Sequence, residues 1–148
     1  MSPEELAYAY NHLATQFPNL RFGNFVVTSP CTPEYNCIAW AANDSKKWWW
    51  PGGKYWPGSD SSAPTIESFI QAFSGMGYEE CESYNLENGY EKIALYIDSS
   101  SLVTHASRQL KDGRWTSKLG LAWDITHDLD GVCGPAYGTV GKILKRPI

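Results

Sequence analysis

Residues 92–120 read KIALYIDSSSLVTHASRQLKDGRWTSKLG, and this stretch decides the fold. It contains three strand-like runs: Lys92–Ile97, Leu102–Leu110 and Trp115–Leu119. The turn residues of Asp98–Ser101 and Lys111–Arg114 separate these runs, and Gly120 ends the last one. Short runs joined by tight turns are typical of antiparallel hairpins. The stretch therefore predicts a three-stranded β-meander.

Two registers of the second hairpin remain open. If Asp112-Gly113 forms a two-residue loop, Thr116 shares the sheet face of His105. If the loop has three residues, Ser117 and Trp115 share that face instead, because a slip of one residue exchanges the two faces of a strand.

The residues before the meander carry helix signals. Ser2-Pro3-Glu4-Glu5 forms a capping box with proline at the first helical position, and apolar residues at helical spacing continue to Phe17. A third helix is expected over Ile66–Phe73, with Thr65 as its cap and a glycine, Gly75 or Gly77, at its end.

A second, shorter helix is expected to open around Thr32-Pro33 or at Asn36 and to run to Asn43. The segment Asp124–His127 reads as a loop or short turn, and Thr139–Leu144 as a last short apolar segment. Helices followed by an antiparallel meander predict an α+β fold, and the length predicts a single domain over residues 1–148.

The composition and charge of the chain exclude several classes of partner. Twelve basic against sixteen acidic residues give a net charge of −4, which argues against a nucleic-acid partner. The sequence shows no recognisable signal peptide and no apolar run that could span a membrane. We therefore expect a cytoplasmic protein without a membrane partner, although leaderless secretion would leave the same sequence. The four cysteines match no metal-binding spacing, so we expect no metal, and we expect no cofactor. In a cytoplasmic protein we expect these cysteines to be free thiols rather than disulfides.

Cys37 and His105 are the candidate catalytic pair. Cys37 lies at or near a helix start, where free N–H groups and the helix dipole favour a thiolate. His105 lies within a strand, and a neutral imidazole facing the thiol could remove its proton. The alternative for each is structural, a small buried cysteine and an ordinary strand histidine. Asp124 and His127 are alternative groups to orient the imidazole.

The chain resembles an uncharacterised family of small bacterial proteins over roughly residues 30–146. The resemblance rests on these segments: Asn36-Cys37-Ile38-Ala39-Trp40-Ala41, Thr104-His105-Ala106 and Thr116-Ser117-Lys118-Leu119-Gly120. More distantly, the order of residues is similar to papain-like cysteine peptidases, including NlpC-like cell-wall amidases. That similarity implies a papain-like fold with Cys37 as nucleophile, His105 as base and Ser117 in the third catalytic place. It also implies a peptide, peptidoglycan-like or protein substrate. The chain lacks the Asp-Cys-Ser-Gly start of the NlpC pattern.

Aromatic residues make up 14% of the chain, and several of them lie in a tryptophan-rich loop, Lys46–Pro57. The candidate contacts for a substrate or partner are Trp48, Trp49, Trp50, Tyr55, Trp56 and Trp115. The alternative is that the loop folds back over the core, which we expect for two of its four tryptophans. Two functions follow: a cysteine hydrolase or acyltransferase acting on an amide or ester, or a non-catalytic binding module of a toxin, immunity or interaction type that uses this loop.

Overall fold

The computed structural model describes residues 1–58 and 63–148 and contains a seven-stranded antiparallel sheet within them. The strands are β1 (Val26–Ser29), β2 (Glu79–Cys81), β3 (Tyr90–Ile97), β4 (Val103–Gln109), β5 (Trp115–Lys118), β6 (Asp124–His127) and β7 (Thr139–Pro147). Their order across the sheet is β1-β6-β5-β4-β3-β7-β2. The three strands of the predicted meander are confirmed as β3, β4 and β5.

Two expectations about the end of the chain are wrong. Asp124–His127 is not a loop, because it pairs with β5 on one side and with β1 on the other. The last segment, Thr139–Pro147, is a nine-residue strand that lies between β3 and β2. The fold is therefore α+β, as predicted, but strands dominate it and the sheet extends beyond a meander on both sides.

Each α-helix begins at a side-chain cap. The helices are α1 (Pro3–Gln16), α2 (Cys37–Ala41) and α3 (Ile66–Ser74), with one 3-10 turn, η1 (Leu129–Val132). Ser2 accepts a hydrogen bond from the N–H of Glu5, and Thr65 accepts one from Ser68, both at 3.1 Å. The predicted ends of α1 and α3 are confirmed within a residue or two, with Gly75 as the cap of α3.

The helix α2 begins after Asn36, one of the two starts that the sequence predicts. The Asn36 Oδ1 accepts hydrogen bonds from the N–H groups of Ala39 and Trp49, both at 3.1 Å. The helix ends at Ala41, earlier than expected, and Asn43 just beyond it has a left-handed backbone with φ of 65°. One asparagine therefore caps the helix that carries Cys37 and ties it to the tryptophan-rich loop.

The three-residue loop is the correct register. Arg108 pairs with Thr116 and Gln109 with Trp115, and the Leu110 N–H donates to the Arg114 carbonyl at 2.7 Å. Side chains alternate between faces along a strand. Ser117 therefore lies on the same face of the sheet as His105.

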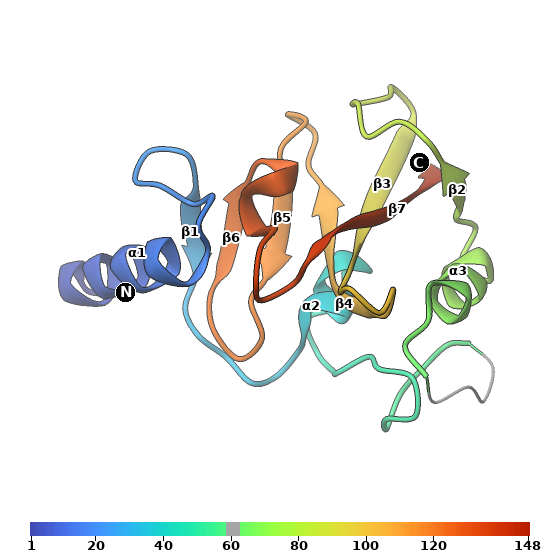
Figure 1. Cartoon of the computed structure of the whole chain (residues 1–148), viewed down its shortest axis with the longest axis horizontal. Helices are drawn as coiled ribbons and strands as arrows, with labels where there is room; N and C mark the ends of the chain where they lie inside the picture. The colour runs from blue at the N-terminus through green and yellow to red at the C-terminus, as the bar shows by residue number, and fades with distance from the viewer. Residues whose placement is uncertain (59–62) are drawn as a thin grey trace.

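Two hydrophobic cores lie on the two faces of the sheet. One includes Leu13 and Phe17 of α1 with Tyr96 and Ile125 of the sheet. The other is formed by α2 and α3 with residues such as Leu95 of β3. Figure 1 shows α1 beside β1 at one end of the sheet and α3 beside β2 at the other, with α2 against β4 and β5.

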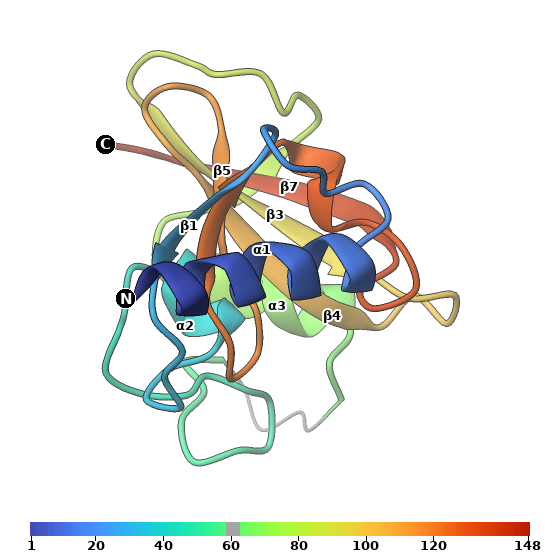
Figure 2. The same ribbon diagram turned by 90° about the vertical axis from the view of Figure 1, so that its left-hand side faces the viewer.

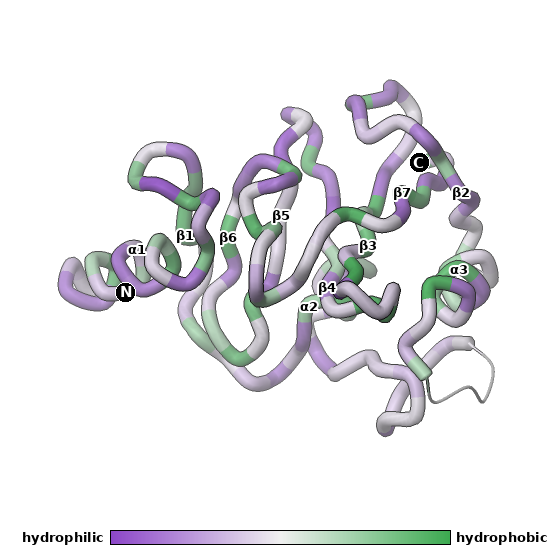
Figure 3. Tube along the Cα trace, viewed as in Figure 1, coloured by the Kyte–Doolittle hydropathy of each residue, from purple (hydrophilic) through white to green (hydrophobic). Residues whose placement is uncertain are grey.

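The view in Figure 2 shows the strong twist of the sheet, with α1 crossing in front and α2 and α3 behind it. In Figure 3, hydrophobic residues recur along the central strands and at α3, whereas the loop between β2 and β3 is largely hydrophilic. The layers are therefore helix, sheet and helix, with the central strands β3 to β6 covered on both faces. These strands carry the candidate site.

Candidate functional site

The site is built where β4 and β5 part. The ladder between these strands contains only two pairs, Arg108 with Thr116 and Gln109 with Trp115. Beyond them, His105 on β4 and Ser117 on β5 are not paired through their backbones. The helix α2 packs against both strands. Unpaired backbone groups and buried polar side chains are thus available in the middle of the fold.

Cys37 is the first residue of α2 and is 8% exposed. Burial raises the pKa of its thiol to about 11, although backbone N–H groups of Ala106, Ile38 and Cys37 itself act in the opposite direction. The expectation that the helix start favours a thiolate is therefore wrong for the resting protein. The helix has only five residues, and desolvation of the charged form outweighs its N–H groups.

His105 is fully buried and belongs to a chain of polar side chains. Its Nε2 lies 2.9 Å from the Oγ of Ser117, and that Oγ lies 2.7 Å from Nε2 of His127. The Nδ1 of His127 donates to the carbonyl of Asp128 at 2.6 Å. Three neighbouring strands, β4, β5 and β6, supply the three side chains. The structure brings together His105, Ser117 and His127, all three of which the sequence analysis singled out.

The other nitrogen of His105, Nδ1, is buried and has no hydrogen-bond partner among the residues that the structure describes. Burial, followed by the charge of a protonated His127, holds the pKa of His105 well below its usual range. The imidazole is therefore neutral at neutral pH. A neutral imidazole with one nitrogen held and the other unoccupied has the form of a general base.

Tyr137 covers this imidazole. The two rings are stacked, with centroids 4.0 Å apart and planes inclined by 6°. Burial raises the pKa of the Tyr137 phenol, and the charge of a Cys37 thiolate would raise it further. Sequence reasoning missed this residue, because it arrives from the loop before β7 and no local pattern marks it.

Cys37 lies near the backbone of β4 next to His105, and not beside the imidazole of His105 itself. The helix α2 packs on the opposite face of the sheet from His105, as shown by the hydrogen bond from Trp40 Nε1 to Thr116 Oγ1 at 3.0 Å. The thiol is close to the backbone N–H of Ala106, the residue after His105. Within the described residues, no hydrogen bond joins Cys37 to His105.

Asp124 is not an orienting group for His105. It pairs with Lys118, so it lies on the opposite face of the sheet from Ser117 and His127. Its Oδ2 accepts a hydrogen bond from the hydroxyl of Tyr35 at 2.6 Å, and burial raises its pKa. Of the two alternative orienting groups, only His127 is in contact with the chain that reaches His105.

The tryptophan-rich loop folds back over the core more completely than expected. Trp49 is 5% exposed and donates from Nε1 to Asp44 at 2.8 Å. Trp50 and Trp56 are half-buried, and each rests on Phe69, with ring centroids 5.9 and 4.8 Å apart. Both tryptophans therefore pack in T-shaped contacts against α3.

The remaining predicted contacts differ among themselves. Trp48 is 42% exposed, and its Nε1 donates to the Pro33 carbonyl at 2.6 Å. Tyr55 is half-buried under the ammonium of Lys47, which lies 4.0 Å from the ring centroid. Trp115 is buried at 2% exposure but contributes to the wall of a surface cavity of about 510 Å³. Trp48 is the member of the set that presents a large apolar surface to solvent.

The four cysteines differ in their exposure to solvent. All four cysteines are free thiols, with Cys31 exposed and Cys81 and Cys133 half-buried. The described residues contain no group of three or more histidine, cysteine, aspartate or glutamate side chains placed to hold a metal ion. Nor does the described part of the chain contain a helix of the length and hydropathy needed to cross a bilayer.

Comparison with known proteins identifies a family. A family model with the description Domain of unknown function (DUF7689) matches residues 26–145. The chain belongs to this family. The DUF7689 match includes Cys37, His105, Ser117 and His127, and it begins after α1. It confirms the predicted membership of an uncharacterised domain family, but it carries no resemblance to peptidases. No curated protein and no solved structure matches the chain significantly.

Proposed function

We propose that this DUF7689 domain is a cysteine hydrolase or acyltransferase that acts on an amide or ester bond. The observation that carries the proposal is the state of His105: Ser117 holds its Nε2, and its buried Nδ1 has no partner among the described residues. Leaving a buried polar atom unpaired costs about 1–3 kcal/mol, so such an atom usually has a use. Cys37 is the nucleophile and His105 the base.

The two groups would react from their neutral forms. The thiol proton of Cys37 moves to Nδ1 of His105 as Sγ adds to the carbonyl carbon of the substrate. The imidazolium then gives this proton to the leaving nitrogen or oxygen, and a thioester on Cys37 remains. Water, or another nucleophile, cleaves the thioester and restores the thiol. The backbone N–H groups of Ile38 and Cys37 at the start of α2 act on Sγ, and in this proposal they would stabilise the oxyanion.

The substrate class follows from the resemblance described above. A helix-borne cysteine followed by a strand histidine supports a distant papain-like relationship, and with it a peptide, peptidoglycan-like or protein substrate. The proposed chemistry uses no cofactor, because thiol, imidazole and water supply every atom that moves.

An acyl-transfer assay tests the proposal. The chain is incubated with p-nitrophenyl acetate, and the acetylated residue is located by mass spectrometry of peptides. A Cys31→Ser background removes the exposed thiol, which would react unspecifically. We expect acetyl on Cys37 and a fall of about 10²–10⁴-fold in its rate in His105→Gln, the usual contribution of a general base. His12→Gln, on the exposed face of α1, is the matched control.

Acetylation that does not depend on His105, or that spreads over Cys81 and Cys133, would overturn the proposal. The competing function is a binding module that uses the exposed Trp48 beside Lys47. In that case Cys37→Ala would leave the biological effect of the protein intact, and Trp48→Ala would abolish it.

A further inference from the structure

The hydrogen positions in the polar chain can be derived from its far end. The carbonyl of Asp128 can only accept a hydrogen bond, so the contact at 2.6 Å places a proton on Nδ1 of His127. Burial lowers the pKa of His127 to about 4, so at neutral pH its other nitrogen, Nε2, carries no proton. That nitrogen can therefore only accept.

The direction of the next two hydrogen bonds follows. The hydroxyl of Ser117 has one proton, and the accepting Nε2 of His127 at 2.7 Å takes it. The Oγ of Ser117 then accepts from His105 across 2.9 Å, which requires a proton on Nε2 of His105. The opposite tautomer would place an N–H on Nδ1, where the described residues offer it no acceptor. Both arguments therefore place the proton of His105 on Nε2 and leave Nδ1 without one.

We propose that His127 is a positioning residue: acting through Ser117, it fixes the proton of His105 on Nε2 and keeps Nδ1 a proton acceptor. The assignment of His105 as a base rests on the proposed function, but the tautomer itself does not. The contact between Ser117 and His105 alone would permit either tautomer, because a hydroxyl can donate or accept. The carbonyl of Asp128 and the neutral His127 remove this freedom.

Nuclear magnetic resonance of the imidazole nitrogens tests the inference directly. Two-bond proton–nitrogen spectra of the full chain, labelled with ¹⁵N-histidine and recorded at pH 7, distinguish the two tautomers. We expect the Nε2-protonated pattern for His105 and the Nδ1-protonated pattern for His127. In His127→Phe and in Ser117→Ala the His105 signals should shift toward a mixture of tautomers. His12→Gln assigns the third histidine and should leave the other two unchanged.

A proton on Nδ1 of His105 in the unmodified protein would overturn the inference. So would an unchanged His105 pattern in Ser117→Ala, which stays decisive if His127→Phe does not fold. The outcome of the acyl-transfer assay is independent of the outcome of the tautomer measurement. A protein with the expected tautomers but no acetylation of Cys37 would refute the hydrolase and leave the positioning role of His127 in place.

Discussion

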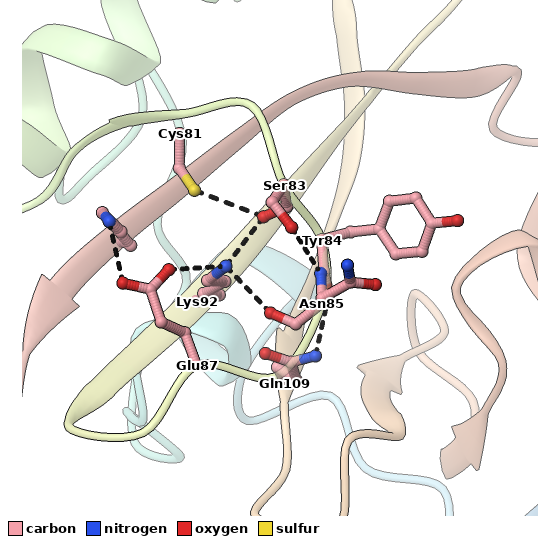
Figure 4. A network of polar contacts seen from close by, with 8 residues as sticks. Cys81, Ser83, Tyr84, Asn85, Glu87, Lys92 and Gln109 are labelled. Atoms are coloured by element: carbon pink, nitrogen blue, oxygen red, sulfur yellow. Dashed lines mark hydrogen bonds and ion pairs between the residues drawn. The ribbon is translucent and has the colours of Figure 1, made fainter.

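Buried polar residues in this protein are held by partners that match their charge. Lys92 on β3 has a side chain that is 1% exposed, and its ammonium donates to the carbonyls of Ser83 and Asn85 at 2.8 and 2.9 Å. It also forms an ion pair with Glu87 at 3.2 Å. Figure 4 shows the loop between β2 and β3 wrapped around this ammonium. His105 and Asp124 differ, because Nδ1 of His105 and Oδ1 of Asp124 are buried without a hydrogen-bond partner in the described residues.

At the residue scale, the prediction concerns the buried ammonium of Lys92. Lys92→Met leaves two carbonyls without a donor, and we expect the free energy of unfolding to fall by about 2–4 kcal/mol. Lys142→Met on β7 is the control, because its ion pair with Glu80 at 2.9 Å is partly exposed and should contribute less than about 1 kcal/mol. Urea unfolding measures both. Equal losses would show that the loop carbonyls do not depend on Lys92.

At the same scale, residue type alone identified the candidate site but not its protonation. Cys37 and His105 could be singled out because the chain contains only four cysteines and three histidines, whereas Ser117 came from the resemblance to papain-like peptidases. The raised pKa of the Cys37 thiol could not be predicted, since the burial that causes it depends on α2, β4 and the loop around them. Tyr137 stayed hidden because its contact with His105 spans 32 positions of the sequence.

At the scale of elements, local signals predicted what local interactions determine. The runs of β3, β4 and β5 are joined by short turns, so neighbouring residues fix their pairing. The strand β6 has no such signature, because Asp124–His127 contains a single aliphatic residue and becomes a strand only through pairing with β1 and β5. The position of β7 beside β3 likewise depends on contacts over forty or more positions of the sequence.

The start of β7 supplies an element-scale prediction. Gly138 has a φ of 80° and exchanges two backbone hydrogen bonds with Gly134, and a Cβ on it would lie 1.9 Å from the carbonyl oxygen of Ile97. Gly138→Ala should therefore destabilise the protein well beyond the cost of a left-handed backbone. Gly23 has a φ of 101° with nothing within 4 Å, so Gly23→Ala should cost only about 1–2 kcal/mol.

Urea unfolding of the two alanine variants, with folding checked by circular dichroism, compares these costs. The difference isolates the close approach of the loop that carries Tyr137 to the end of β3. If Gly138→Ala and Gly23→Ala cost the same, the backbone conformation accounts for both effects, and the contact with Ile97 is unimportant.

On the scale of the whole molecule, two histidines lie inside the sheet without charge. Burial lowers the pKa of His127 to about 4 and holds that of His105 well below its usual range. In the unfolded chain both would titrate near pH 6.5. Below that pH the unfolded state binds protons that the folded state does not, so acid favours unfolding.

The free energy of unfolding should therefore fall as the pH decreases from about 6.5 toward 4. The slope should approach about 1.4 kcal/mol per pH unit for each histidine, or about twice that for the pair. Between pH 6 and 5 Asp44 and Glu87, whose pKa values are lowered, contribute little, because they titrate at more acidic pH. Asp124, whose pKa is raised by burial, contributes with the opposite sign and makes the measured slope smaller.

Two histidine variants test whether the pH dependence of the free energy of unfolding comes from the histidines inside the sheet. His127→Gln should remove about half of it, whereas His12→Gln on the exposed face of α1 should leave it unchanged. Urea unfolding across this pH range gives the slopes. A flat profile from pH 6.5 to 5 would mean that the folded protein accommodates a proton on His105 or His127. The neutral hydrogen-bond chain through Ser117 could then not be the state of the protein at these pH values.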